Sequence, residues 1–329
     1  MKKISFLLVL SFFCQLVKAQ EYTPQKDDFA HTFSVVARDT TTGEMAVAVQ
    51  SHWFSVGTSV PWAKSGVGVV ATQSFVNPAY GPNGLELMEQ GKTASEALGI
   101  LVAQDEGKDF RQVAFLDVNG NAAAFTGDKC VKYASDLSGE NFSVQANMML
   151  TADVVPAMEK AFRENKELPL AERLIEVLKA AQAAGGDIRG RQSAALIVVG
   201  AEKAENPWED KMINLRVDDS ENPLVELERL LKVARAYEFM NRGDLAVEKN
   251  DMQDALKQYG NAMKLFPENL EMKYWTAVAL ANSGRMDEAL PMFGEIFSKD
   301  ENWKEMTRRL PASGLLTVSE EEMQKIMDQ

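Results

Sequence analysis

The first clear pattern of hydrophobic and polar positions along the chain is that of two strands joined by a turn. Residues 32–37 (TFSVVA) and 45–49 (MAVAV) are short runs rich in strand-forming residues, and residues 39–43 (DTTTG) between them carry turn chemistry. Thr32 therefore stands at the head of the first strand. Ser34 is expected on the same face, because alternate side chains of a strand point the same way.

Further strands and helices are predicted up to about residue 217. Strands are predicted at apolar runs bounded by turn residues, namely 66–72, 111–117, 121–125, 142–149, 194–199 and 212–217. Helices are predicted at 85–90, 94–103, 152–165 and 170–184. Residues 61–65 and 73–84 are predicted as a turn and a loop. This order favours two stacked sheets between helical layers over an alternating β-α-β fold.

The C-terminal part of the chain is helical in pattern and repeats after 34 residues. Residues 254–256 (DAL) and Tyr259 recur as residues 288–290 (EAL) and Phe293. The region of about residues 236–301 therefore resembles two tetratricopeptide repeats, each a helix–turn–helix unit. About three repeats are usually needed to bury a continuous core, so flanking helices are expected to cap the pair. A protein partner is the expectation for this part of the chain.

The chain begins with the pattern of a secretory signal. Lys2 and Lys3 precede an apolar run that is too short to span a bilayer comfortably, and Ala19 ends a small-residue cleavage site. Export to the periplasm or the extracellular space is therefore expected, and no other segment is predicted to be transmembrane. The predicted regions are a signal peptide at 1–19, a flexible leader at 20–31, a mixed domain at 32–222 and a helical domain at 223–329.

Composition narrows the classes of function. The formal net charge of −13 is unsuited to a nucleic-acid backbone or an anionic membrane surface. Two histidines are too few for a three-histidine zinc site, and signal cleavage leaves Cys130 as the remaining cysteine. The sequence has neither a Walker loop nor a GxGxxG motif. We therefore expect no metal, no cofactor and no nucleic-acid partner, while oligomerisation stays open.

Four segments carry a family resemblance: 32–73, 77–88 (NPAYGPNGLELM), 186–199 (GDIRGRQSAALIVV) and 213–219 (INLRVDD). Over about residues 32–231 the chain resembles the DUF1028 family. The resemblance implies the fold of N-terminal nucleophile (Ntn) hydrolases, a four-layer αββα sandwich. The chain is therefore expected to be α+β, with this sandwich followed by an all-α tetratricopeptide-like domain. Many members begin Met-Thr-Phe-Ser, which places Thr32 at the position of a terminal threonine.

Thr32 is the catalytic nucleophile that the resemblance implies. An internal threonine has no general base of its own, whereas a terminal one has an α-amine, with a pKa of about 7.7, to take the hydroxyl proton. Signal cleavage leaves residues 20–31 in place, so the hypothesis requires a second cleavage between His31 and Thr32. Ntn enzymes often make this cut themselves. Without it, Thr32 is a strand residue with a satisfied hydroxyl.

Three further residues are candidates for the catalytic group. Ser34 either orients the Thr32 hydroxyl or simply packs. His52, predicted at the end of the second strand, is a general base, a substrate contact or a satisfied strand-end residue. Lys64 lies in a predicted turn. Several Ntn hydrolases use a lysine to lower the pKa of the nucleophile, and the alternative is a solvated turn lysine.

Six polar residues are candidates for binding substrate: Asn77, Tyr80, Asn147, Arg189, Arg191 and Gln192. The first two lie in a predicted loop that could line a cleft. Asn147 alternates with Gln145 on one strand face, where both are oxyanion donors or buried ladder polar groups. The last three lie near glycines, where the arginines either clamp a substrate carboxylate or form an exposed salt-bridged loop.

The predicted function is an exported Ntn-type amidohydrolase that acts on a peptide or cell-envelope amide. Two alternatives stay open at this point. The first is an uncut, non-catalytic Ntn-like binding module. The second is a scaffold protein in which the tetratricopeptide-like helices do the work of recruiting a partner.

Overall fold

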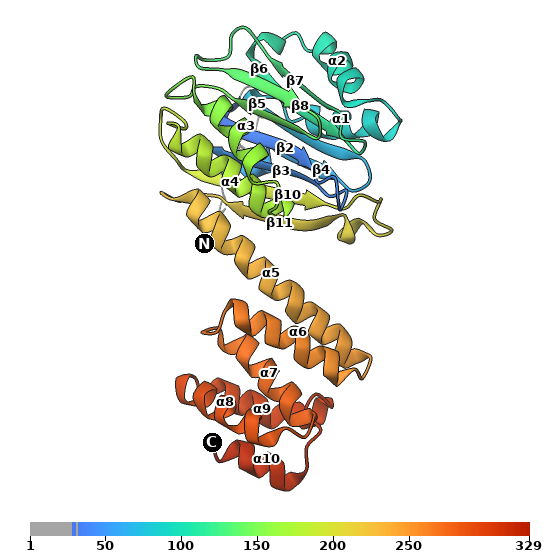
Figure 1. The fold of residues 1–329 in the computed structure, drawn as a ribbon, viewed down its shortest axis with the longest axis vertical. Coiled ribbons are helices and arrows are strands. Elements are labelled where there is room, and N and C mark those ends of the chain that lie inside the picture. Colours follow the sequence, from blue (N-terminus) through green and yellow to red (C-terminus); the bar gives the residue numbers. More distant parts are fainter. Residues whose placement is uncertain (1–27, 31) are drawn as a thin grey trace, which may run out of the picture.

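The computed structural model describes residues 28–30 and 32–329. The last strand of a sandwich of sheets and helices ends at residue 217, and an arm of helices extends away from the sandwich (Figure 1). The chain is therefore α+β with an all-helical C-terminal part, as predicted. The expected signal peptide, residues 20–27 of the leader and His31 lie outside the described residues.

Two antiparallel sheets form the centre of the sandwich. The five-stranded sheet has the order β1-β5-β6-β7, with β4 also paired to β5: β1 Asp28–Ala30, β4 Pro61–Lys64, β5 Gly68–Val76, β6 Arg111–Asp117 and β7 Ala122–Thr126. The six-stranded sheet has the order β11-β10-β3-β2-β9-β8: β2 Thr32–Arg38, β3 Met45–Ser51, β8 Ser135–Gly139, β9 Phe142–Ala146, β10 Ser193–Val199 and β11 Lys211–Val217.

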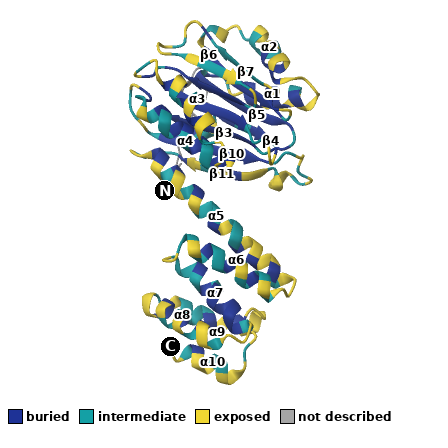
Figure 2. Cartoon of the chain, in the orientation of Figure 1, coloured by how far each residue is buried: buried dark blue, intermediate teal, exposed yellow. Residues whose placement is uncertain are grey.

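Helical pairs cover the outer faces of both sheets (Figure 1). The pairs are α1 Tyr80–Glu89 with α2 Ala94–Gln104 on the five-stranded sheet, and α3 Val154–Glu164 with α4 Leu170–Ala183 on the six-stranded sheet. Apolar side chains fill all three interfaces, which gives four layers in the order αββα. Figure 2 shows the central strands as the most continuously buried part of the molecule.

The strand β2 illustrates how one segment serves two interfaces. Phe33 and Val35 pack with the apolar cluster under α3 and α4, whereas Val36 belongs to the cluster between the sheets. Because side chains alternate along a strand, Thr32 and Ser34 share the inter-sheet face with Val36. The head of β2 therefore points polar groups into the middle of the sandwich.

Several elements differ from the sequence prediction. The structure adds β1 in the expected flexible leader, turns the predicted turn at 61–65 into β4, extends β5 to Val76, starts α1 at Tyr80 inside the predicted loop and adds β8. Close packing explains why α1 begins earlier than predicted. A Cβ at Gly81 would lie 2.2 Å from Trp62 Cγ, and one at Gly84 would lie 2.4 Å from Phe115 Cζ. These glycines, unfavourable for a helix locally, let it approach the sheet.

The helical arm consists of α5 Pro223–Glu248, α6 Met252–Leu265, α7 Leu270–Asn282, α8 Met286–Lys299, α9 Asn302–Arg309 and α10 Glu320–Met327. The predicted repeat pairs the C-terminal half of α5 with α6, and α7 with α8. Gly243 allows the first pair to approach closely, since a Cβ there would lie 2.3 Å from Tyr259 Cε1. None of the helices in the described part of the chain has the length and apolar character that a bilayer crossing demands.

Candidate functional site

Thr32 lies at one end of the space between the two sheets and is fully buried. It stands opposite Ser51, the last residue of β3, and Ser51 stands opposite Ser193, the first residue of β10. Because directly opposed residues share a face of the sheet, the three hydroxyl groups lie on one face in a row. The Thr32 hydroxyl donates a hydrogen bond to Ser51 Oγ at 3.1 Å.

Amide groups from both sheets hold the carbonyl oxygen of Thr32. Gln73 on β5 donates from Nε2 to this oxygen at 3.0 Å and to Gln112 Oε1 on β6 at 2.7 Å. Asn147, just after β9, donates its backbone N–H to the same carbonyl at 3.1 Å and its Nδ2 to Gln112 Oε1 at 3.0 Å. All three amide residues are fully buried.

Ser34 belongs to the same set of contacts but reaches Thr32 through Gln73. Its hydroxyl donates to Gln73 Oε1 at 2.6 Å and accepts from Gln145 Nε2 at 3.1 Å. We call Ser34, Gln73, Gln112, Gln145 and Asn147 the amide network. Every member is uncharged and fully buried, so the network adds polar groups to the core without the cost of burying a charge.

Two residues with left-handed backbone flank the amide network. Ser74 directly follows Gln73 and has φ of 72°, and Met148 directly follows Asn147 and has φ of 58°. Residues other than glycine rarely adopt this region, at a cost of about 1–3 kcal/mol each, unless the surroundings impose it. The packing that holds these two conformations also aims the neighbouring amides at Thr32.

A loop at residues 187–192 forms the rim of the same end of the sandwich. The side chain of Asp187 is fully buried and binds Arg189, with Nη2 to Oδ2 at 2.7 Å. Asp187 also accepts the backbone N–H of His52 at 3.2 Å. The charge of Arg189 is therefore matched within the loop, and Asp187 fastens this loop to the end of β3.

The other predicted rim residues gather nearby. His52 is half-buried, and its Cδ2 would lie 3.3 Å from a Cβ built on Gly190. Gln192 donates to Asp219 Oδ1 at 3.2 Å, and Arg191 is exposed. The structure thus brings Thr32, Ser34 and Asn147 into one network, and it places the four rim residues at that network's end of the sandwich: His52, Arg189, Arg191 and Gln192.

Asn77 and Tyr80 lie on a different side of the five-stranded sheet. Tyr80 belongs to the apolar layer under α1 and α2, not to the space between the sheets. Both residues line a cavity of about 320 Å³ that also contains Asp105. Burial and the neighbouring Asp105 carboxylate raise the pKa of Tyr80. The five-stranded sheet therefore separates these two candidates from the Thr32 hydroxyl.

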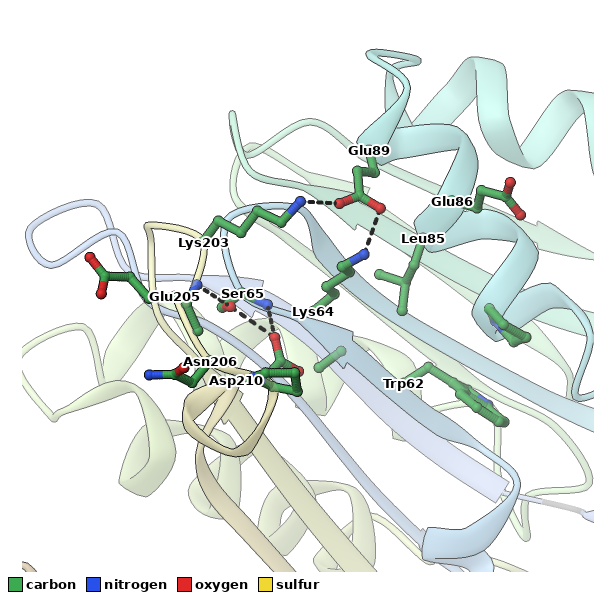
Figure 3. A pocket seen from close by; sticks show the side chains of 14 residues that line it. Trp62, Lys64, Ser65, Leu85, Glu86, Glu89, Lys203, Glu205, Asn206 and Asp210 are labelled. Carbon is green, nitrogen blue, oxygen red and sulfur yellow. Dashed lines mark hydrogen bonds and ion pairs between the residues drawn. The ribbon is translucent and has the colours of Figure 1, made fainter.

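Lys64 lies in β4, at the opposite end of the sandwich from Thr32. It pairs with Gly68 at the start of β5, whereas Gln73 lies near the end of that strand. Lys64 lines a cavity of about 780 Å³ (Figure 3). There Glu89 accepts from Lys64 at 2.5 Å and from Lys203 at 2.6 Å. Lys64 therefore belongs to an ion-pair cluster with Glu89 and Lys203 and does not contact Thr32.

Four residues of the site were not predicted from sequence: Ser51, Gln73, Gln112 and Ser193. Gln73 and Gln112 are single amides at the ends of apolar strand segments, VGVVATQ and RQVAF. A lone polar residue on an otherwise apolar, two-sided buried strand is a usable signal, since its burial demands a partner. The partner's identity depends on which strands face each other, which the local pattern does not reveal.

No group of three or more potential metal-ligating side chains occurs within residues 28–30 and 32–329. The geometry defines a class of protein: an αββα sandwich with a buried threonine between its sheets, extended by a helical arm. The chain belongs to the family described as a family of unknown function (DUF1028), which matches residues 32–227. A tetratricopeptide repeat matches residues 240–295.

One similar solved structure is that of protein SPO2555 from Silicibacter pomeroyi, assigned to the same family. The two chains are 30% identical with a TM-score of 0.56, over 62% of this chain and 89% of that one. No match was found among curated proteins. The similarity covers the sandwich and supports the same fold for it, and it carries no named activity.

Proposed function

We propose that this protein is an exported Ntn-type amidohydrolase whose nucleophile is Thr32, freed by cleavage of the bond that precedes it. The setting of Thr32 supports this. Its described hydrogen-bond partners are the Ser51 hydroxyl and the amides of Gln73 and Asn147, none of which is a base near neutral pH. The hydroxyl then needs the α-amine that cleavage at His31–Thr32 creates.

The proposed cleavage is an acyl shift followed by hydrolysis. The Thr32 hydroxyl oxygen attacks the carbonyl carbon of His31, the C–N bond breaks, and the Thr32 nitrogen gains the hydroxyl proton. Water then splits the ester, which releases the leader as a carboxylic acid and restores the hydroxyl. An amide substrate follows the same course, with the freed α-amine shuttling the proton and the substrate amine leaving first.

The surroundings of Thr32 suit the two further tasks of such a site. Ser51 orients the hydroxyl, and the amide donors of Gln73 and Asn147 hold the Thr32 carbonyl, and with it the backbone of the nucleophile, in place. A peptide or cell-envelope amide is the substrate class that matches an exported enzyme. The tetratricopeptide repeats suggest a protein–protein interaction, so the helical arm is proposed to recruit a protein partner.

Intact mass and N-terminal sequencing of the mature protein test the proposal. Active material should begin at Thr32, and activity in a chain that begins only at Gln20 would contradict the mechanism. Thr32→Ala should abolish both cleavage and hydrolysis, whereas Thr32→Ser should keep both at a reduced rate. Thr307→Ala is the control, because Thr307 is equally buried but lies on α9 of the arm, where its hydroxyl bonds to the Trp303 carbonyl.

A further inference from the structure

The strand β1 occupies an edge of β5 immediately before the candidate nucleophile. Residues Asp28, Phe29 and Ala30 pair antiparallel with Val76, Phe75 and Ser74 in that order. β6 pairs along one edge of β5, and β4 pairs with residues 68–71 on the other edge. The leader strand thus completes the edge that β4 leaves open at residues 74–76.

The chain changes sheets between Ala30 and Thr32. Ala30 belongs to the five-stranded sheet through β5, whereas Thr32 pairs with Ser51 in the six-stranded sheet. The bond to be cleaved in the proposed reaction lies within this crossing. The residues before this bond supply the acyl group in the self-cleavage reaction. The strand β1 therefore shows where the chain on the acyl side binds: along the edge of β5.

We infer that the β5 edge at Ser74–Val76 is the substrate subsite, and that it binds the acyl part of an extended peptide by strand addition. The inference rests on the proposed function. Self-cleavage and substrate hydrolysis use one hydroxyl group, so the attacked carbonyl must occupy one place in both reactions. The chain on the acyl side of a substrate then follows the path that the leader takes along β5.

The β5 edge is built rigidly enough to act as a template. Arg111 is largely buried; its Nη1 donates to the Phe75 carbonyl at 2.8 Å, and its Nε to Asp105 Oδ2 at 3.0 Å. Ser74, opposite Ala30, is the residue with φ of 72°. An open strand edge offers unpaired backbone donors and acceptors, which an extended peptide satisfies whatever its side chains. Recognition should therefore depend on peptide length and backbone N–H groups.

Hydrolysis by a chain that begins at Thr32 tests this mode of binding. The chain is made with a cleavable fusion directly before Thr32, and the probes are aminocoumarin amides of acetyl-His and acetyl-Asp-Phe-Ala-His. The longer probe should be cleaved with a kcat/KM at least about tenfold higher, since it adds backbone hydrogen bonds. N-methylation should lower kcat/KM about tenfold at alternate positions only. Equal rates for the two probes, or indifference to N-methylation, would overturn the inference.

Peptide binding to catalytically dead full-length chains separates the inference from the proposed function. In a Thr32→Ala background, the double variant Phe29→Pro, Ala30→Pro should prevent β1 from pairing and let fluorescent acetyl-Asp-Phe-Ala-His amide bind, because the N–H groups of adjacent strand residues point to opposite edges and one of the two must face β5. Gln25→Pro, upstream of β1, is the control and should leave the edge blocked. Binding without hydrolysis by any Thr32-initiated chain supports the subsite and contradicts the enzyme. Hydrolysis of short amides without peptide binding supports the enzyme and contradicts the subsite.

Discussion

At the scale of single residues, Thr32 is fixed more firmly at its carbonyl than at its hydroxyl. Gln73 and Asn147 both donate to the carbonyl oxygen, whereas the hydroxyl bonds, among the described residues, to Ser51 alone. A nucleophile has to keep its position while its hydroxyl changes partners. The amide network therefore suits a residue whose backbone stays in place through a reaction.

Gln112 is the member of the amide network on which the others converge. Its Oε1 accepts from Gln73 and Asn147, and its Nε2 donates to Thr126 Oγ1 at 2.8 Å and to the Ala146 carbonyl at 3.0 Å. An apolar residue in its place would leave two buried amide N–H donors without an acceptor. A substitution at Gln112 should therefore destabilise the protein strongly, although Gln112 does not contact the Thr32 hydroxyl.

Gln112→Leu should lower the free energy of unfolding by about 2–6 kcal/mol, because each of the two buried donors left without an acceptor costs about 1–3 kcal/mol. Urea denaturation measures the effect. Gln253→Leu, an exposed position in the arm, is the control and should change stability by less than about 0.5 kcal/mol. Equal stability of the two variants would show that the network contributes little to holding the sheets together.

At the scale of elements, the repeat pattern and the start of α2 were predicted from sequence. Thr93 and Glu96 form a capping box at the start of α2, with Glu96 N–H to Thr93 Oγ1 at 3.3 Å and Thr93 N–H to Glu96 Oε2 at 2.9 Å. In the arm, small residues let paired helices touch. Tyr259 fills the gap above Gly243 and donates to Asp244 Oδ1 at 2.7 Å.

Gly243→Ala should destabilise the arm by about 1–3 kcal/mol, since the new methyl group meets the Tyr259 ring and the helices must separate. Gly260→Ala is the matched control on α6, because a Cβ there meets nothing within 4 Å. This control should stabilise the arm by about 0.5–1 kcal/mol through helix propensity. Thermal unfolding of the full chain gives both values, and the same sign for both variants would contradict the packing argument.

The ion-pair cluster at Glu89 joins segments that are distant in the sequence: β4, α1 and the loop that contains Lys203 (Figure 3). Hydrogen bonds from Lys203 and Lys64 hold the pKa of Glu89 at about 2, below its ordinary value of 4.5. Because the folded-state pKa is lowered, the stabilisation is fully present above pH 4.5 and is lost as the pH falls through about 2.

Glu89→Gln should therefore be less stable than the wild type at pH 7, and the difference should shrink between pH 4.5 and 2. The cluster is solvated, so the effect at pH 7 should also weaken in high salt. Urea denaturation at several pH values measures it. Glu86→Gln on the same helix is the control, because the Glu86 carboxylate accepts from Gln90 instead of the lysines. A difference that grows on acidification would contradict this assignment.

At the scale of the whole molecule, α5 belongs to both bodies. Leu224, Leu227 and Leu231 are buried in the apolar cluster of the sandwich, while the C-terminal half of the helix packs on α6. Arg235 binds Glu172 on α4 at 3.0 Å, just beyond the last of these leucines. The first part of α5 therefore packs as part of the sandwich, and its C-terminal half belongs to the arm.

A chain that ends at Leu231 should stay folded, whereas one that ends at Asn222 should lose about 4 kcal/mol or more. The shorter chain lacks three leucines, each of which contributes about 1.5–3 kcal/mol when buried. Urea denaturation of the two truncated chains gives the comparison, with the full chain as reference. Equal stability of the two would show that α5 is only a linker.

Much of the fold could be predicted from sequence because its signals are local. Runs of strand-forming residues marked β2 and β3, turn residues marked their connection, and a 34-residue shift marked the repeats. The candidate site was only partly accessible in this way. Thr32, Ser34 and Asn147 were expected together and lie in one network, but Gln73 fell in a predicted loop.

The sequence by itself determined most of the elements and which residue heads the central strand, because hydrophobic pattern and turn chemistry act over a few residues. Only the tertiary structure decided which side chains share a site. Strand order placed Gln73 and Gln112 opposite Thr32, sent Lys64 to the other end of the sandwich and seated β1 on β5. These outcomes depend on pairing between segments far apart in the chain, and no local pattern records that pairing.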